Sequence, residues 1–164
     1  MQTELEEFSR CWELQTEGTI ALMRSLPRDK YSYRPDSGGR SMGELAWHLA
    51  EIEAYVTLGI EHGEVRLDLK PPHIERPQTV EELAPAFGIV HDDATERIAR
   101  LRVSDLGREI LDPSGQRWSI RNVLWHKLLM HTAHHAGQLM LLCRLAGGLP
   151  PALFGPTREG SRPG

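Results

Sequence analysis

The sequence of 164 residues predicts an all-α protein, a four-helix bundle with long connections. Four long segments repeat apolar residues with the period of an α-helix, and no segment shows the alternation of a half-buried strand. Clusters of proline and glycine separate the four segments. We expect one domain over residues 1–164, with an irregular tail from about 148 to 164.

The first helix is expected from about Thr3 to Ser25, because Pro27 disfavours a helical residue before it. Its apolar stripe is interrupted by Gln15 and Thr19. These two are either core residues that find partners or the lining of a polar cavity. The expected core positions are Leu5, Phe8, Trp12, Leu22 and Leu26.

The second helix is expected to begin at a capping box. Ser41 and Glu44 have the spacing at which a serine and a glutamate satisfy each other's backbone N–H groups. The helix should end near Gly63. Its expected inner positions are Leu45, His48, Leu49, Ile52, Tyr55 and Val56.

Prolines between residues 64 and 78 exclude a regular helix there. Thr79 and Glu82 form a second capping-box pattern, so the third helix is expected from Thr79 to about Arg102, with Pro85 loosening its second turn. The expected core positions are Leu83, Phe87, Val90, Ala94, Ile98 and Leu101. The expected outward positions are Asp92, Asp93, Glu96, Arg97 and Arg100.

The fourth helix is expected from Ile120 to about Ala146, after a turn at residues 112–115 and an N-cap at Ser119. It is apolar on more than one face, so it lies at the bundle centre or contacts a partner subunit. We therefore expect a homodimer. The connections of about 15 residues are long for a bundle, so a simple up-and-down order is not required.

Composition excludes several classes of function. The net charge of −4 lacks the basic excess that a nucleic-acid surface needs, and the longest apolar stretches are too short to cross a bilayer. The acidic N-terminal segment has no apolar run typical of a signal peptide, and Cys11 and Cys143 fit two reduced, packed thiols. We expect a cytoplasmic protein with no nucleic-acid or membrane partner.

Three of the eight histidines have the placement of metal ligands. His131 and His135 stand four residues apart, so both project to one side of the fourth helix. This is the spacing by which one helix supplies two imidazoles to a metal. His48 lies on the inner face of the second helix. Because buried imidazoles need partners, the three predict a site for one divalent ion.

The other histidines are not assigned to the site. His134 either substitutes as a ligand or takes an outer or surface position, and His91 can reach the core but has no local partner. His126 lies opposite His131 on the same helix. Glu44 is a fourth ligand, an outer partner of a ligand, or only the capping residue. His62 and His73 fall at a helix end and in a loop.

The segments at 41–49 and 131–139 resemble the DinB-like (DNA-damage-inducible) superfamily. The resemblance implies a four-helix bundle, often a dimer, whose divalent metal is held by one histidine of the second helix and two of the fourth. These correspond to His48, His131 and His135, with Gln138 in the same segment. Ala136 stands where the family usually has an arginine.

Three imidazoles leave at least one coordination position for water or substrate. Zinc or nickel is expected, and iron or manganese can also bind. Relatives include S-transferases and a maleylpyruvate isomerase that use mycothiol or bacillithiol, so the resemblance implies that a low-molecular-weight thiol attacks a small-molecule electrophile. A hydrolase using metal-activated water and a stress-related metal-binding protein without catalysis remain alternatives. An open position facing a cavity favours an enzyme, whereas a fourth protein ligand favours a structural metal.

Overall fold

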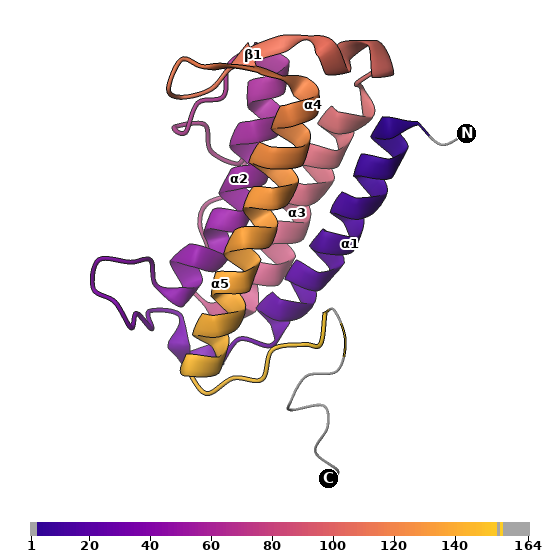
Figure 1. The fold of residues 1–164 in the computed structure, drawn as a ribbon. Coiled ribbons are helices and arrows are strands. Elements are labelled where there is room, and N and C mark those ends of the chain that lie inside the picture. The colour runs from indigo at the N-terminus through magenta and orange to yellow at the C-terminus, as the bar shows by residue number, and fades with distance from the viewer. Residues whose placement is uncertain (1–2, 154, 156–164) are drawn as a thin grey trace.

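The computed structural model describes residues 3–153 and 155, and within them it is the helical bundle that the sequence predicts (Figure 1). Three columns are single helices, and the fourth is built of three consecutive helical segments. The columns are α1 (Glu4–Arg24), α2 (Met42–His62), α3 (Val80–Ala99), and α4 (Ile120–Asn122) with η3 (Val123–Met130) and α5 (His131–Leu145). The short helical turns η1 (Arg28–Lys30) and η2 (Val103–Gly107) lie in the connections.

Helices α2 and α3 run in the same direction, so the bundle is not a simple up-and-down array (Figure 1). Contacts between them advance together along both helices: Glu53 with His91, Thr57 with Arg97, and Glu61 with Arg100. The connection 63–79 must therefore run back along the length of the bundle. The connection is long enough to make this crossover, as its length in the sequence allowed.

The helices begin and end close to the positions predicted from the sequence, with two exceptions at the third helix. The capping box of Ser41 and Glu44 forms as predicted. The one predicted at Thr79 is wrong, because the Thr79 hydroxyl donates to Glu82 Oε2 at 2.9 Å and accepts no backbone N–H. The third helix also ends at Ala99 rather than near Arg102, and it continues through Pro85.

One connection contains a short pair of strands that the sequence pattern did not predict. β1 (Glu109–Leu111) and β2 (Arg117–Ser119) form an antiparallel hairpin before the fourth column. Asp112 closes its turn by accepting hydrogen bonds from the backbone N–H groups of Ser114 and Gln116. Strands of three residues are too short to show an alternating pattern, which is why the sequence did not reveal them.

The most buried column is α2, not the fourth. All six inner positions predicted on α2 are buried. On the fourth column, Met130, Leu141 and Leu145 remain 58%, 58% and 55% exposed. A central position for the fourth helix is therefore wrong, and its apolar outer face stays available for a partner. No helix in the described part of the chain is long and apolar enough to cross a membrane.

Two polar side chains whose partners the sequence did not reveal are paired inside the bundle. His91, which had no local partner, lies with its Nδ1 2.9 Å from Glu53 Oε2, and Glu53 also accepts from the Trp12 indole at 3.0 Å. Arg97 was expected to point outward but is only 8% exposed, and its guanidinium pairs with Asp93. A buried charge requires a partner. The partner of His91 lies on the neighbouring helix α2, and Asp93 lies on the same helix as Arg97.

Thr19 is a buried core residue that finds a partner in Gln15, which is itself only partly buried. The buried Thr19 hydroxyl donates to the Gln15 carbonyl oxygen at 2.9 Å, and the Gln15 amide lies 3.5 Å from that hydroxyl. Gln15 also lines a cavity of about 760 Å³ between α1 and α5, whose walls are mainly apolar side chains such as Leu129 and Leu153. The alternative of a polar cavity is therefore wrong.

Candidate metal centre

The structure brings the three predicted histidines together. One ligand nitrogen from each of His48, His131 and His135 lies within 4.8 Å of the others. The Nε2 atoms of His131 and His135 are 3.0 Å apart. Imidazole nitrogens bound to one zinc ion at about 2.0–2.1 Å stand roughly 3–3.5 Å from each other, so the distance between His131 and His135 fits a shared ion, and His48 lies close enough to complete the set.

Each of the three rings has a polar side chain behind it at Nδ1, in hydrogen-bond contact with His48 and His135 and at a longer distance from His131. The partners are Glu51 Oε2 at 3.2 Å from His48, Gln138 Oε1 at 2.7 Å from His135, and the Tyr55 hydroxyl oxygen at 3.4 Å from His131. An acceptor at Nδ1 favours the tautomer that carries its proton there and leaves the Nε2 lone pair free. This arrangement of outer partners is typical of metal-ligating histidines.

The environment keeps two of the imidazoles in the form that binds metal. Burial, followed by the charges of His135 and His48, lowers the pKa of His131 to about 4. Burial also lowers the pKa of His135, although its hydrogen bond to Gln138 partly opposes this. Both rings are therefore neutral at neutral pH, as metal coordination requires.

The two histidines of the fourth column follow a π-helical segment, η3 (Val123–Met130). The sequence predicted one uninterrupted α-helix from Ile120 to about Ala146, and this is wrong over these eight residues. A π-helical turn holds one more residue than an α-helical turn, so it changes the face on which every later side chain lies. α5 begins at His131 directly after that change.

The site has no fourth protein ligand in the part of the chain that the structure describes. Glu44, one of the candidates, accepts a hydrogen bond from the Ser41 backbone N–H at 2.8 Å and pairs with Arg34, so it serves as the capping residue. His134, another candidate, lies 3.1 Å from the Gln138 amide and belongs to the layer behind His135.

Hollows adjoin the site on two sides, so it is not sealed. His131 lines a small cavity of about 150 Å³ together with Tyr55 and Lys127. His135 lines a larger one of about 540 Å³ that it shares with Arg40 and Gln138. An exogenous ligand can therefore approach the imidazoles.

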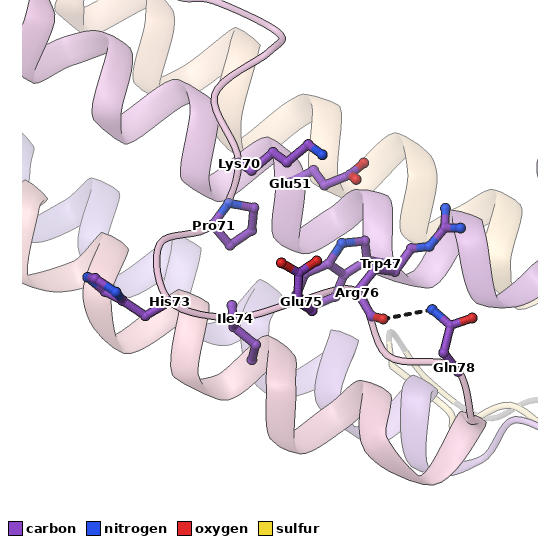
Figure 2. A pocket seen from close by; sticks show the side chains of 9 residues that line it. All are labelled: Trp47, Glu51, Lys70, Pro71, His73, Ile74, Glu75, Arg76 and Gln78. Atoms are coloured by element: carbon purple, nitrogen blue, oxygen red, sulfur yellow. Dashed lines mark hydrogen bonds between the residues drawn. The ribbon is translucent and has the colours of Figure 1, made fainter.

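Glu51, which is hydrogen-bonded to His48, also lines a third cavity, of about 760 Å³. Figure 2 shows Trp47 and Glu51 of α2 beside the connection that carries Lys70 and Arg76. The hydrogen bond from His48, opposed by burial and supported by the charges of His48, Arg40 and Arg76, lowers the pKa of Glu51. Glu51 is thus a carboxylate at neutral pH.

Sequence reasoning did not assign Glu51 and Tyr55 to the site. Glu51 follows His48 by three residues on the same helix, a spacing at which side chains meet, so this signal was available. Tyr55 was predicted only as an inner position of its helix. Its contact with His131 joins residues 76 positions apart, which no local pattern reveals.

Comparisons with known proteins agree with this fold. YrdA of Bacillus subtilis (strain 168), an uncharacterized protein, is 24% identical over 157 residues, covering 94% of this chain and 90% of the relative. A DinB-like protein from Bacillus cereus ATCC 10987 superposes with a TM-score of 0.74 at 24% identity, covering 90% of this chain and 95% of that one. The DinB-like protein YjoA from Bacillus subtilis gives 0.71 at 22% identity, with 90% and 96% covered.

The family match is broader than these pairwise likenesses. Residues 12–139 match the model described as the DinB superfamily, and this segment contains all three histidines of the site. The matched segment spans well over half of the 164 residues. The chain therefore belongs to the DinB superfamily.

Proposed function

We propose that this chain is a metal-dependent transferase, in which a low-molecular-weight thiol attacks a small electrophile beside a divalent ion held by His48, His131 and His135. The observation that carries the proposal is the gathering of these three imidazoles within 4.8 Å of one another beside an open cavity. A divalent ion on three imidazoles keeps a position for an exogenous ligand and lowers the pKa of a thiol or water bound there. Zinc or nickel suits the site best, with iron or manganese as alternatives.

The protein's own groups orient and tune the ligand set. The Glu51 carboxylate accepts a hydrogen bond from His48 Nδ1. This bond fixes the orientation of the ring and makes the Nε2 lone pair more basic toward a metal ion. Gln138 holds His135 in the same way. Burial raises the pKa of Tyr55 to about 12, so its hydroxyl remains protonated beside His131 at neutral pH.

The nucleophile is proposed to be an external thiol because the chain offers none at the site. Both cysteines lie elsewhere: Cys143 is buried against Ser25, and Cys11 lies on α1 beside Glu7. In the proposed reaction the thiol gives up its proton to solvent water and its sulfur bonds to the electrophilic carbon. The bond from that carbon to the leaving group breaks with its electron pair. No net oxidation or reduction occurs.

The openness of the site argues against a purely structural metal. His135 borders a cavity of about 540 Å³, and no fourth side-chain ligand is present among the described residues. A water in place of the thiol would make the same site a hydrolase. The two reactions differ in their requirement for a thiol, so one assay separates them.

The test compares the metal-loaded protein with two histidine variants. Protein loaded with zinc, nickel, iron or manganese is incubated with glutathione, bacillithiol or mycothiol and a chloro-dinitrobenzene, and thioether formation is followed by absorbance. His48→Ala should fall to the uncatalysed rate. His62→Ala, an exposed position on the same helix, should match the wild type.

Metal content and circular dichroism are measured on every sample. Equal rates for wild type and His48→Ala across all metals and thiols would contradict the transferase proposal. Metal-dependent hydrolysis of an activated ester without any thiol would favour the hydrolase. Stoichiometric metal with neither activity would leave the non-catalytic, stress-related metal-binding role.

A further inference from the structure

Arg40 is an exposed arginine beside the metal centre. It lies in the connection immediately before Ser41, the N-cap of α2. Among residues 3–153 and 155, no hydrogen bond or ion pair is found for its guanidinium. Arg34, in the same connection, donates to Glu44 at 2.6 Å and to the Gly39 carbonyl oxygen. Arg40 is therefore free to take up an external anion.

Arg40 shares a cavity with one of the three histidines. The cavity of about 540 Å³ is lined by Arg40 together with His135 and Gln138, and it has the size of a small-molecule site. Leu45, Leu141 and Leu142 provide apolar wall between these polar groups. A ligand in this cavity can contact both the guanidinium and the imidazoles.

The positive charge of Arg40 affects the pKa of three groups in and around the candidate metal centre. It contributes to lowering the pKa of His135, after burial and other larger causes. It also contributes to the lowered pKa of Glu51, behind the hydrogen bond from His48. For Tyr55, it opposes the increase in pKa that burial causes. Arg40 therefore acts on groups from both helices that supply histidines.

We propose that Arg40 binds a carboxylate of the ligand that reaches the metal centre, so that the thiol or the electrophile carries an anionic group. The planar guanidinium offers paired N–H donors that match the two oxygens of a carboxylate. Asp36 lines the same cavity, and its negative charge disfavours a dianionic phosphate there. The identification of the other end of the ligand as a thiol rests on the proposed function.

Arg76 provides a matched control for charge. Its positive charge also helps to lower the pKa of Glu51, although it lines a separate cavity together with Trp47 and Glu51 (Figure 2). Arg40→Gln and Arg76→Gln therefore remove the same charge from the surroundings of Glu51. Only the first removes a donor from the cavity that contains His135.

The experiment measures thiol binding to cobalt-loaded protein by the sulfur-to-cobalt charge-transfer absorption. Mercaptopropionate and its methyl ester share the thiol and the carbon chain, and the ester replaces the negative charge with one methyl group. Wild type should bind the acid on the order of tenfold more tightly than the ester, and Arg40→Gln should remove this preference. Arg76→Gln should retain it. No preference in the wild type, or equal losses in the two variants, would overturn the proposal.

A second arm separates this inference from the proposed function. If no thiol binds the cobalt ion in any variant, the transferase proposal fails. Succinate binding to the zinc-loaded protein is then measured by calorimetry. Succinate should still bind the wild type and Arg76→Gln on the order of tenfold more tightly than Arg40→Gln. Succinate binding that does not depend on Arg40, or no succinate binding, would overturn the carboxylate site.

Discussion

The Glu51→Gln variant tests whether the carboxylate behind His48 supports the metal site. Glutamine keeps the size of the side chain and an acceptor oxygen, so the change removes mainly the negative charge 3.2 Å from His48 Nδ1. Loss of an outer partner of a metal ligand typically costs 10–100-fold in affinity, or about 1.4–2.7 kcal/mol. The Glu51 side chain is 38% exposed, and solvent screening places the expected loss at the lower end, about tenfold.

The Tyr55→Phe variant gives an internal comparison. The Tyr55 hydroxyl oxygen stands 3.4 Å from His131 Nδ1, beyond the usual hydrogen-bond distance, and it carries no charge at neutral pH. Its removal should weaken metal binding by no more than about threefold, or about 0.6 kcal/mol. The structure therefore predicts an order of effects as well as a direction.

Metal affinity is measured by competition with a chromogenic zinc chelator at fixed pH and salt. Glu96→Gln, an exposed change on α3, serves as the control for charge alone and should bind zinc as tightly as the wild type. Circular dichroism confirms that each variant is folded. Unchanged affinity in Glu51→Gln, or a larger loss in Tyr55→Phe than in Glu51→Gln, would refute the reasoning.

Three further predictions concern stability and assembly. His91→Gln leaves the buried Glu53 without its cationic partner and should lower the free energy of unfolding by about 3 kcal/mol in urea titrations. Burial alone lowers the pKa of His91, but its bond to Glu53 and nearby negative charge outweigh burial and raise it above 6.5. The stability that His91 contributes is therefore full below about pH 6.5 and is lost as the pH rises through the raised pKa; a loss independent of pH would contradict this. Hydrogen bonds, of which the one from the Ser114 side chain is the largest cause, lower the pKa of Asp112 to about 2. The stability that Asp112 contributes is therefore present above about pH 3.8 and is lost as the pH falls through about 2. Asp112→Asn should accordingly lower the melting temperature at neutral pH and have a much smaller effect near pH 2; equal effects at both would count against it. Light scattering should give twice the 18.5 kDa chain mass at micromolar concentrations, and Leu141→Glu should reduce it to one chain; a monomeric wild type would defeat the dimer.

The parts of the structure that follow local rules could be predicted from the sequence. The start of α2 depends on Ser41 and Glu44, two residues whose spacing is itself the signal. The meeting of His131 and His135 depends only on the helical period, which holds from the first residue of α5 onward. Such features are determined within a few residues, so one sequence is enough to reveal them.

The parts that depend on distant neighbours could not be predicted in this way. His91 pairs with Glu53, 38 residues away, only because the long connection makes α2 and α3 parallel. Arg97 is buried for the same reason, since Thr57 and Glu61 lie on the facing side of α2. A charged residue on a helical pattern is expected outward until the neighbouring helix is known.

The distribution of burial between the two helices that supply histidines determines where a ligand can enter. His48 is only 9% exposed on the most buried helix, and the Glu53–His91 pair joins that same helix to α3. α2 thus holds its histidine in place but offers no direct route to it. His131 and His135 are half-buried on a helix whose outer face is exposed, and both border cavities. A ligand can therefore reach the three histidines from the side of His131 and His135, and the larger of the two cavities there is the one that contains Arg40.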